Sequence, residues 1–171
     1  MNSVPPNVIR VSTPTDTTIV LTRSFNASRQ RVWDAFFTPH LLRRWTLLPP
    51  GLTMTICECD ARVGGALRLV SKSDEADPAM TLAGDFVEVV QHERAVHTET
   101  MALGSGEVIG SLVEAHEFSQ SNGITTMRIT QEYPSKEARD GVIESGMIDG
   151  MEACYQQLDA LLTETRSTSA P

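Results

Sequence analysis

The chain of 171 residues lacks the signatures of membrane and secreted proteins. None of its apolar runs approaches the roughly 20 residues that a transmembrane helix needs. Its first segment, MNSVPPNVIRVSTPTD, has no apolar central stretch like that of a secretory signal peptide. We therefore expect a cytoplasmic protein that does not insert into a membrane.

Cysteine is also scarce, with Cys57, Cys59 and Cys154 as the three examples. Cys57 and Cys59 are two apart on a predicted strand, so they share a face and are poorly placed to bridge each other. The chain has no CxxC motif, and no pair of histidines has the spacing of metal ligands. We expect free, buried thiols, no bound metal and no cofactor.

Positive charge is rare in the second half of the chain. Residues 1–72 hold nine Lys and Arg against four Asp and Glu, whereas residues 73–171 hold five against eighteen. The acidic part argues against nucleic acid as the main partner. The acidic strands and the last helix could instead form the surface of a homodimer.

The order of predicted elements indicates an α+β fold. Residues 17–25, TTIVLTRSF, are β-branched and partly alternating, which predicts a first strand. Two short helices follow, the first with Ser28 as its N-cap. About six strands come next, and the tandem Gly64-Gly65 predicts one of the hairpin turns. Short connections favour antiparallel neighbours, with the helices on one face of the sheet.

The composition of the two ends sets the expected domain limits. Residues 1–15 are rich in Pro, Ser, Thr and Asn, and we expect a flexible segment there. Residues 16–163 form a single domain in this interpretation, and residues 164–171 form a flexible tail.

The last predicted helix, residues 135–162, places large apolar side chains on one stripe: Met147, Met151, Tyr155, Leu158 and Leu162. Three glycines in the same segment weaken it as a helix. The stripe is typical of a helix that faces the core. It also suits a lid over a cavity, in which Met147, Met151 and Tyr155 contact a bound molecule.

Trp45 is the fourth candidate for ligand contact. It follows the second short helix and precedes two leucines and two prolines. At this position the Trp45 side chain could line the entrance of a pocket, and it could equally pack in the core.

No established catalytic motif occurs: the chain has no nucleophile elbow, phosphate-binding loop or paired-carboxylate motif. His97 and Glu99 are two apart on a predicted strand and therefore share a face. They form a candidate general acid/base pair if that face is concave, and a solvated pair if it is not. Asp85, on a neighbouring strand, is a third candidate.

Several stretches together resemble a known family: RSFNASRQRVWDAFFTPHLLRRW, CDARVGGALRL, LAGDFVEVVQHERAVHTE and YPSKEARDGVIESGMIDGMEACYQQLDALL. In this order they are similar to the branch of the START-like (SRPBCC) superfamily named after the activator of the 90-kilodalton heat-shock protein ATPase, the AHSA-like branch. The resemblance implies a helix-grip fold. In that fold a curved antiparallel sheet of about six to seven strands wraps around a long C-terminal helix, with two short helices after the first strand.

The resemblance implies a cavity rather than a particular reaction. We expect a non-catalytic binding or carrier protein for a small hydrophobic or aromatic molecule, held between the sheet and the C-terminal helix. A polyketide cyclase or dehydratase-like enzyme that uses polar residues of the same cavity is the alternative. A module that interacts with a chaperone, as the family name suggests, is the third hypothesis.

Overall fold

One antiparallel sheet forms the centre of the protein in the computed structural model, which describes residues 7–167. Within these residues the sheet has eight strands in the order β1-β2-β8-β7-β6-β5-β4-β3. The strands are β1 (Arg10–Ser12), β2 (Thr18–Phe25), β3 (Thr53–Cys59), β4 (Ala66–Lys72), β5 (Met80–Val90), β6 (Arg94–Leu103), β7 (Val108–Ser121) and β8 (Ile124–Glu132). The helices are α1 (Arg29–Phe37), α2 (Pro39–Trp45), α3 (Lys136–Glu144) and α4 (Met147–Ser167).

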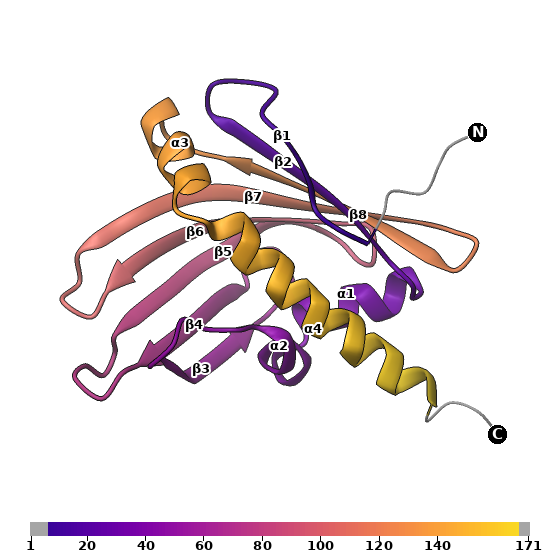
Figure 1. Ribbon diagram of the computed structural model, residues 1–171, viewed down its shortest axis with the longest axis horizontal. Coiled ribbons are helices and arrows are strands. Elements are labelled where there is room, and N and C mark those ends of the chain that lie inside the picture. Colours follow the sequence, from indigo (N-terminus) through magenta and orange to yellow (C-terminus); the bar gives the residue numbers. More distant parts are fainter. Residues whose placement is uncertain (1–6, 168–171) are drawn as a thin grey trace.

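The helices lie on one side of a curved sheet. Figure 1 shows α4 running diagonally across the concave face, with α1 and α2 on the same side. Both short helices contact α4, and α1 also contacts β7 and β8. The predicted α+β helix-grip architecture is therefore confirmed, with eight strands in place of the expected six or seven. None of the helices between residues 7 and 167 is long and apolar enough to cross a membrane.

The first short helix begins where the sequence predicts. The hydroxyl of Ser28 accepts a hydrogen bond from the backbone N–H of Arg31, which caps one of the free donors at the start of α1. One face of α1 then buries Val32, Trp33 and Phe36 against the sheet and α4. The cap and the apolar face together determine how α1 enters the core.

The predicted C-terminal helix is two helices rather than one. Gly146 adopts a φ of 79° between α3 and α4, a left-handed conformation that glycine reaches without a steric cost. The backbone N–H of Ser145 bonds back to the carbonyl of Gly141, so α3 ends there. The expectation of a continuous helix over residues 135–162 was wrong because the apolar stripe indicates a common face but not the break within it.

Both ends of the described chain are more regular than the composition suggests. Arg10–Ser12, within the segment expected to be flexible, forms β1 and pairs with the stretch from Val20 to Thr22 of β2. At the other end α4 continues to Ser167, four residues beyond the expected domain limit at 163. Residues 1–6 and 168–171 of the two expected flexible segments lie outside the described residues.

A buried cation joins the long helix to the sheet. Arg23 of β2 has no exposed surface, and its guanidinium bonds Glu152 at 3.0 Å and Asp159 at 2.8 Å, both on α4. Its charge also lies over the ring of Phe25, 4.8 Å from the centroid. These contacts fix α4 along the strand that neighbours β8.

Candidate functional site

A group of polar side chains lies on the concave face of the sheet. The pairing of strands places His97 of β6 opposite Glu114 of β7, and Glu114 opposite Gln131 of β8. His116 is two residues after Glu114 and therefore shares its face. Because neighbouring strands supply these residues, chain segments far apart in the sequence form one buried cluster.

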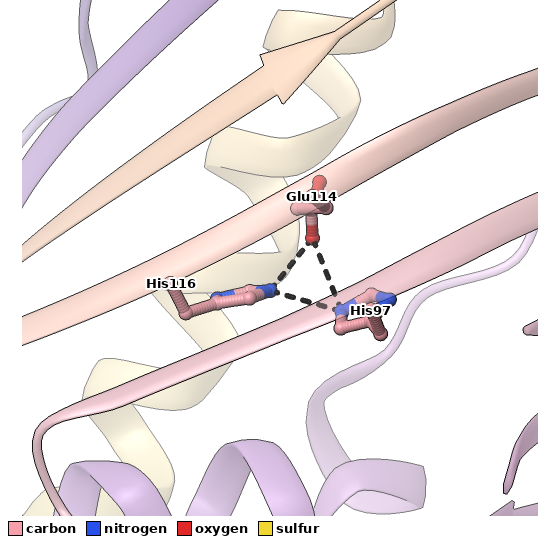
Figure 2. A group of neighbouring side chains, drawn as sticks. All are labelled: His97, Glu114 and His116. Carbon is pink, nitrogen blue, oxygen red and sulfur yellow. Dashed lines mark hydrogen bonds and ion pairs between the residues drawn. The ribbon is translucent and has the colours of Figure 1, made fainter. Parts of the chain in front are cut away.

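Three of these side chains converge on one point, as Figure 2 shows. Glu114 Oε1 lies 2.7 Å from His116 Nε2 and 3.9 Å from His97 Nε2. The two Nε2 atoms are 3.4 Å apart, and the imidazole planes are nearly parallel at 24°. We call His97, Glu114 and His116 the histidine–glutamate cluster.

Hydrogen bonds beyond the cluster orient its carboxylate. Gln131 Nε2 donates to Glu114 Oε2 at 2.6 Å, and the hydroxyl of Tyr133 donates to Gln131 Oε1 at 3.0 Å. Glu99 lies on the other side of His97, with Oε1 3.6 Å from Nδ1. The carbonyl of Thr98 is 3.4 Å from the same nitrogen. His97 and Glu114 are thus held from behind by further polar groups.

Burial and the charges of neighbouring groups shift the pKa values of His97, Glu99 and Glu114 in different directions. Burial is the largest influence on His97 and lowers the pKa of its imidazole to about 4. Burial, reinforced by the nearby charge of Glu114, raises the pKa of Glu99 well above its usual range. Burial alone would raise the pKa of Glu114. Interactions with His116, His97 and Gln131 outweigh that effect and lower it to about 2.

Aromatic rings surround the imidazoles. The rings of Phe36 and Phe37 of α1 each lie 5.5 Å from the ring of His116, and Phe86 of β5 lies 5.2 Å from His97. His116 Nδ1, enclosed in this way, has no hydrogen-bond partner among the described residues. An unpaired buried nitrogen of this kind is costly, which sets His116 apart from the other members of the cluster.

An apolar strip lies on the same face, two residues beyond Glu99 along β6. The strand register aligns four half-buried residues in one row across β3, β4, β5 and β6: Cys57, Leu69, Leu82 and Met101. We call them the apolar row. On the helical side, Val142, Ile148, Met151 and Cys154 are also half-buried and pack against the core. Partly covered apolar surface therefore lies both on the strands and on helices α3 and α4. On the strands it ends next to polar side chains.

The candidate residues from the sequence divide into three groups. His97 and Glu99 face the protein interior, with side chains 2% and 17% exposed. Asp85 is exposed, and its backbone N–H bonds the hydroxyl of Thr98, so its side chain lies outside the cluster. The third group contains the four residues proposed to contact a ligand.

Trp45 and Tyr155 lie in the core, whereas Met147 and Met151 are half-buried. Trp45 donates its indole N–H to the carbonyl of Ala35 at 2.9 Å, and its ring lies 5.8 Å from that of Tyr155. Among the four, the two methionines are therefore the ones with surface open to a guest.

Glu114 and His116 were not predicted as site residues from the sequence. They lie in EVIGSLVEAHEF, where the period of two of a strand gives residues 114, 116 and 118 a shared face. The partner His97 is 19 residues away, and only the β6–β7 register brings them together. Strand register, rather than local spacing, was the missing information.

A surface depression of about 430 Å³ lies elsewhere, between the start of α1 and the β7–β8 turn. Its lining includes Arg31 and Asn122 and none of the residues of the cluster. The histidine–glutamate cluster has the polar groups that chemistry needs, and the depression has no comparable set of buried groups, so we place the candidate site at the cluster.

A sheet curved around a long C-terminal helix, with a polar cluster under that helix, defines the protein as a helix-grip domain. A profile of the family described as Activator of Hsp90 ATPase homolog 1-like protein matches residues 26–163, and the chain belongs to this family.

Solved structures show the same fold. A protein from Rhodobacter sphaeroides has 27% sequence identity and a TM-score of 0.82, over 92% of this chain and 99% of that chain. Protein Ms6760 from Mycobacterium smegmatis has 25% identity and a TM-score of 0.76 over the same shares, 92% and 99%. CV1439 from Chromobacterium violaceum has 26% identity and a TM-score of 0.68, over 86% and 98%. No curated protein matches the chain.

Proposed function

We propose that the protein binds and carries a small, largely hydrophobic molecule between the concave face of the sheet and helices α3 and α4. The supporting observation is the apolar row, which runs across four strands and ends beside the buried polar side chains of β6. A site with apolar walls and a few convergent polar groups is the usual form of a small-molecule pocket.

The two parts of the site have separate roles in this proposal. The apolar row and Met151 supply surface that a guest covers, at roughly 25 cal/mol for each Å² of apolar area removed from water. Methionine adapts to irregular shapes because its side chain is unbranched and flexible. Glu99, the most exposed of the acidic groups around His97, presents a carboxyl group to a polar atom of the guest.

The test is saturable uptake of a fluorescent hydrophobic probe such as 1-anilinonaphthalene-8-sulfonate by the folded full-length protein. Met151→Arg, which places a charge among half-buried apolar residues, should abolish uptake. Ala153→Arg on the exposed side of α4 is the matched control and should leave uptake unchanged. Equal uptake by both variants, or no uptake by the wild-type protein, would exclude the proposed pocket.

Acid/base catalysis in the same pocket is a second candidate function. The specific observation is that His97 and Glu99 turn toward the interior and lie 3.6 Å apart, with Glu99 two residues before Met101 of the apolar row. A carboxyl and an imidazole at this position can exchange protons with a carbonyl compound that fills the pocket. Glu99→Gln separates the two functions, because it should abolish turnover of a substrate while leaving affinity for the hydrophobic probe within a few-fold.

A further inference from the structure

The geometry of the histidine–glutamate cluster points to a metal site. We propose that His97 Nε2, His116 Nε2 and one carboxylate oxygen of Glu114 bind a divalent transition-metal ion such as Zn²⁺. The three side chains come from adjacent strands and aim at a common centre (Figure 2). Two imidazoles and one carboxylate are a donor set that zinc and iron sites in proteins use.

The separations between the donor atoms are short enough for one metal ion to contact all three. They form a triangle with sides of 3.4, 2.7 and 3.9 Å. A point equidistant from its three corners lies about 2.0 Å from each, which matches zinc–nitrogen and zinc–oxygen bond lengths. A small displacement of the ion out of the triangle leaves a position open for water or for a guest molecule.

The surroundings supply part of an outer coordination shell. His97 Nδ1 faces the carbonyl of Thr98 and the carboxyl of Glu99, which would keep its proton on Nδ1 and its Nε2 lone pair free. Gln131 holds the second oxygen of Glu114, which orients the first toward the imidazoles. The buried anionic carboxylate of Glu114 also gains a cation as a partner.

His116 is the incomplete part of this site. Its Nδ1 has no hydrogen-bond partner among the described residues, so no hydrogen bond fixes the ring orientation from behind. Loss of such an outer contact typically lowers metal affinity by about 10- to 100-fold. We therefore expect the site to bind the ion more weakly than a structural zinc site does. We also expect a chelator to remove the ion.

The experiment uses the full-length protein after dialysis against a chelator. Zn²⁺ is titrated by calorimetry, and Co²⁺ by its visible d–d absorption, with thermal unfolding measured in parallel. We expect one ion per chain, tetrahedral-type cobalt bands and a rise in the unfolding midpoint that grows with the metal concentration. A folded wild-type protein without binding heat and without these bands would overturn the proposal.

Substitutions of single residues identify which side chains bind the metal. His97→Gln and His116→Ala should each weaken Zn²⁺ binding by at least about 100-fold, as expected for the loss of a direct ligand. His40→Gln, at an exposed position of α2, is the matched control and should bind as the wild type does. Undiminished binding by both cluster variants would overturn the assignment. Glu114→Gln, close to isosteric, provides a third variant if one of the others fails to fold.

The cysteines need a separate readout, because Cys57 and Cys59 also lie on the concave side and are free. Thiolate ligands give cobalt an intense near-ultraviolet charge-transfer band, whereas imidazole and carboxylate ligands do not. The absence of that band supports the histidine–glutamate cluster, and its presence overturns the proposal. Metal binding needs no hydrophobic guest, so this proposal and the carrier function stand or fall separately.

Discussion

Glu114 Oε1 lies 2.7 Å from Nε2 of His116, two residues further along β7 and on the same face of the sheet. The contact is almost fully enclosed, with the two side chains 10% and 6% exposed. A buried carboxylate needs partners of this kind, because its desolvation is costly. The pair therefore ties the stability of the fold to the protonation of the cluster.

The first prediction concerns acid unfolding of the metal-free protein. The folded pKa of His97 is about 4, below its usual 6.5, so the unfolded chain takes up this proton first as the pH falls. The stability due to neutral His97 is present above pH 6.5 and is lost between pH 6.5 and about 4. The loss amounts to about 3 kcal/mol at most. For Glu114, with its pKa lowered to about 2, stability is lost between pH 4.5 and about 2.

Two variants separate these windows in urea unfolding curves measured between pH 7.5 and 3. His97→Gln should remove the rise in stability between about pH 4 and pH 6.5 that neutral His97 contributes, and leave the lower window in place. Glu114→Gln should do the opposite. Identical pH profiles for the wild type and both variants would show that neither group carries the shifted pKa.

The second prediction concerns the cation that joins β2 to α4. Arg23→Met keeps an unbranched side chain of similar length but leaves Glu152 and Asp159 without their partner. Breaking a buried ion pair costs about 3–5 kcal/mol, and we expect the lower end because both carboxylates reach solvent. Arg44→Met, which breaks an exposed pair with Glu164, should cost no more than about 1 kcal/mol. Equal losses in denaturant unfolding would refute the special role of Arg23.

Much of the fold could be predicted from the sequence, because its signals are local. The β-branched composition of residues 17–25 and the N-cap at Ser28 are both local signals, and the structure has a strand at Thr18–Phe25 and the Ser28 cap. The break at Gly146 was missed, since a glycine in a helical pattern is compatible with both a continuous and an interrupted helix. Strand β1 was missed because its stability comes from pairing with β2 rather than from its own composition.

The candidate site could be predicted only in part. His97 and Glu99 are two apart on one strand, and this local spacing was enough to select them. Glu114 and His116 reach the same place through the β6–β7 register, which a single sequence does not specify. Trp45 was selected from the sequence but lies in the core. An indole that follows a helix suits a pocket wall and a core position equally well until the partner of its N–H is known.

The third prediction tests the close approach of β5 and β6 beside the cluster. A Cβ atom added to Gly84 would lie 1.6 Å from the carbonyl oxygen of Thr98, which is backbone and cannot rotate away. Gly84→Ala should therefore destabilise the fold by more than about 3 kcal/mol or prevent folding. Gly110→Ala in β7 is the matched control, because its Cβ meets nothing within 4 Å. Thermal unfolding of the two variants checks the difference, and a stable Gly84→Ala protein would contradict it.

The fourth prediction is that removing an acidic group stabilises the protein at neutral pH. Burial raises the pKa of Glu99 above its usual 4.5, so the folded state binds this proton more tightly than the unfolded state does. Its favourable contribution is complete below pH 4.5 and is lost as the pH rises toward the folded pKa.

Glu99→Gln mimics the protonated form at every pH. Its free energy of unfolding, measured in urea on metal-free protein, should exceed that of the wild type at pH 7, and the difference should shrink toward zero near pH 4. A variant less stable than the wild type at pH 7 would mean that Glu99 is ionised and holds His97 by charge. That result would favour a charged His97–Glu99 pair over the neutral imidazole that the burial of His97 implies.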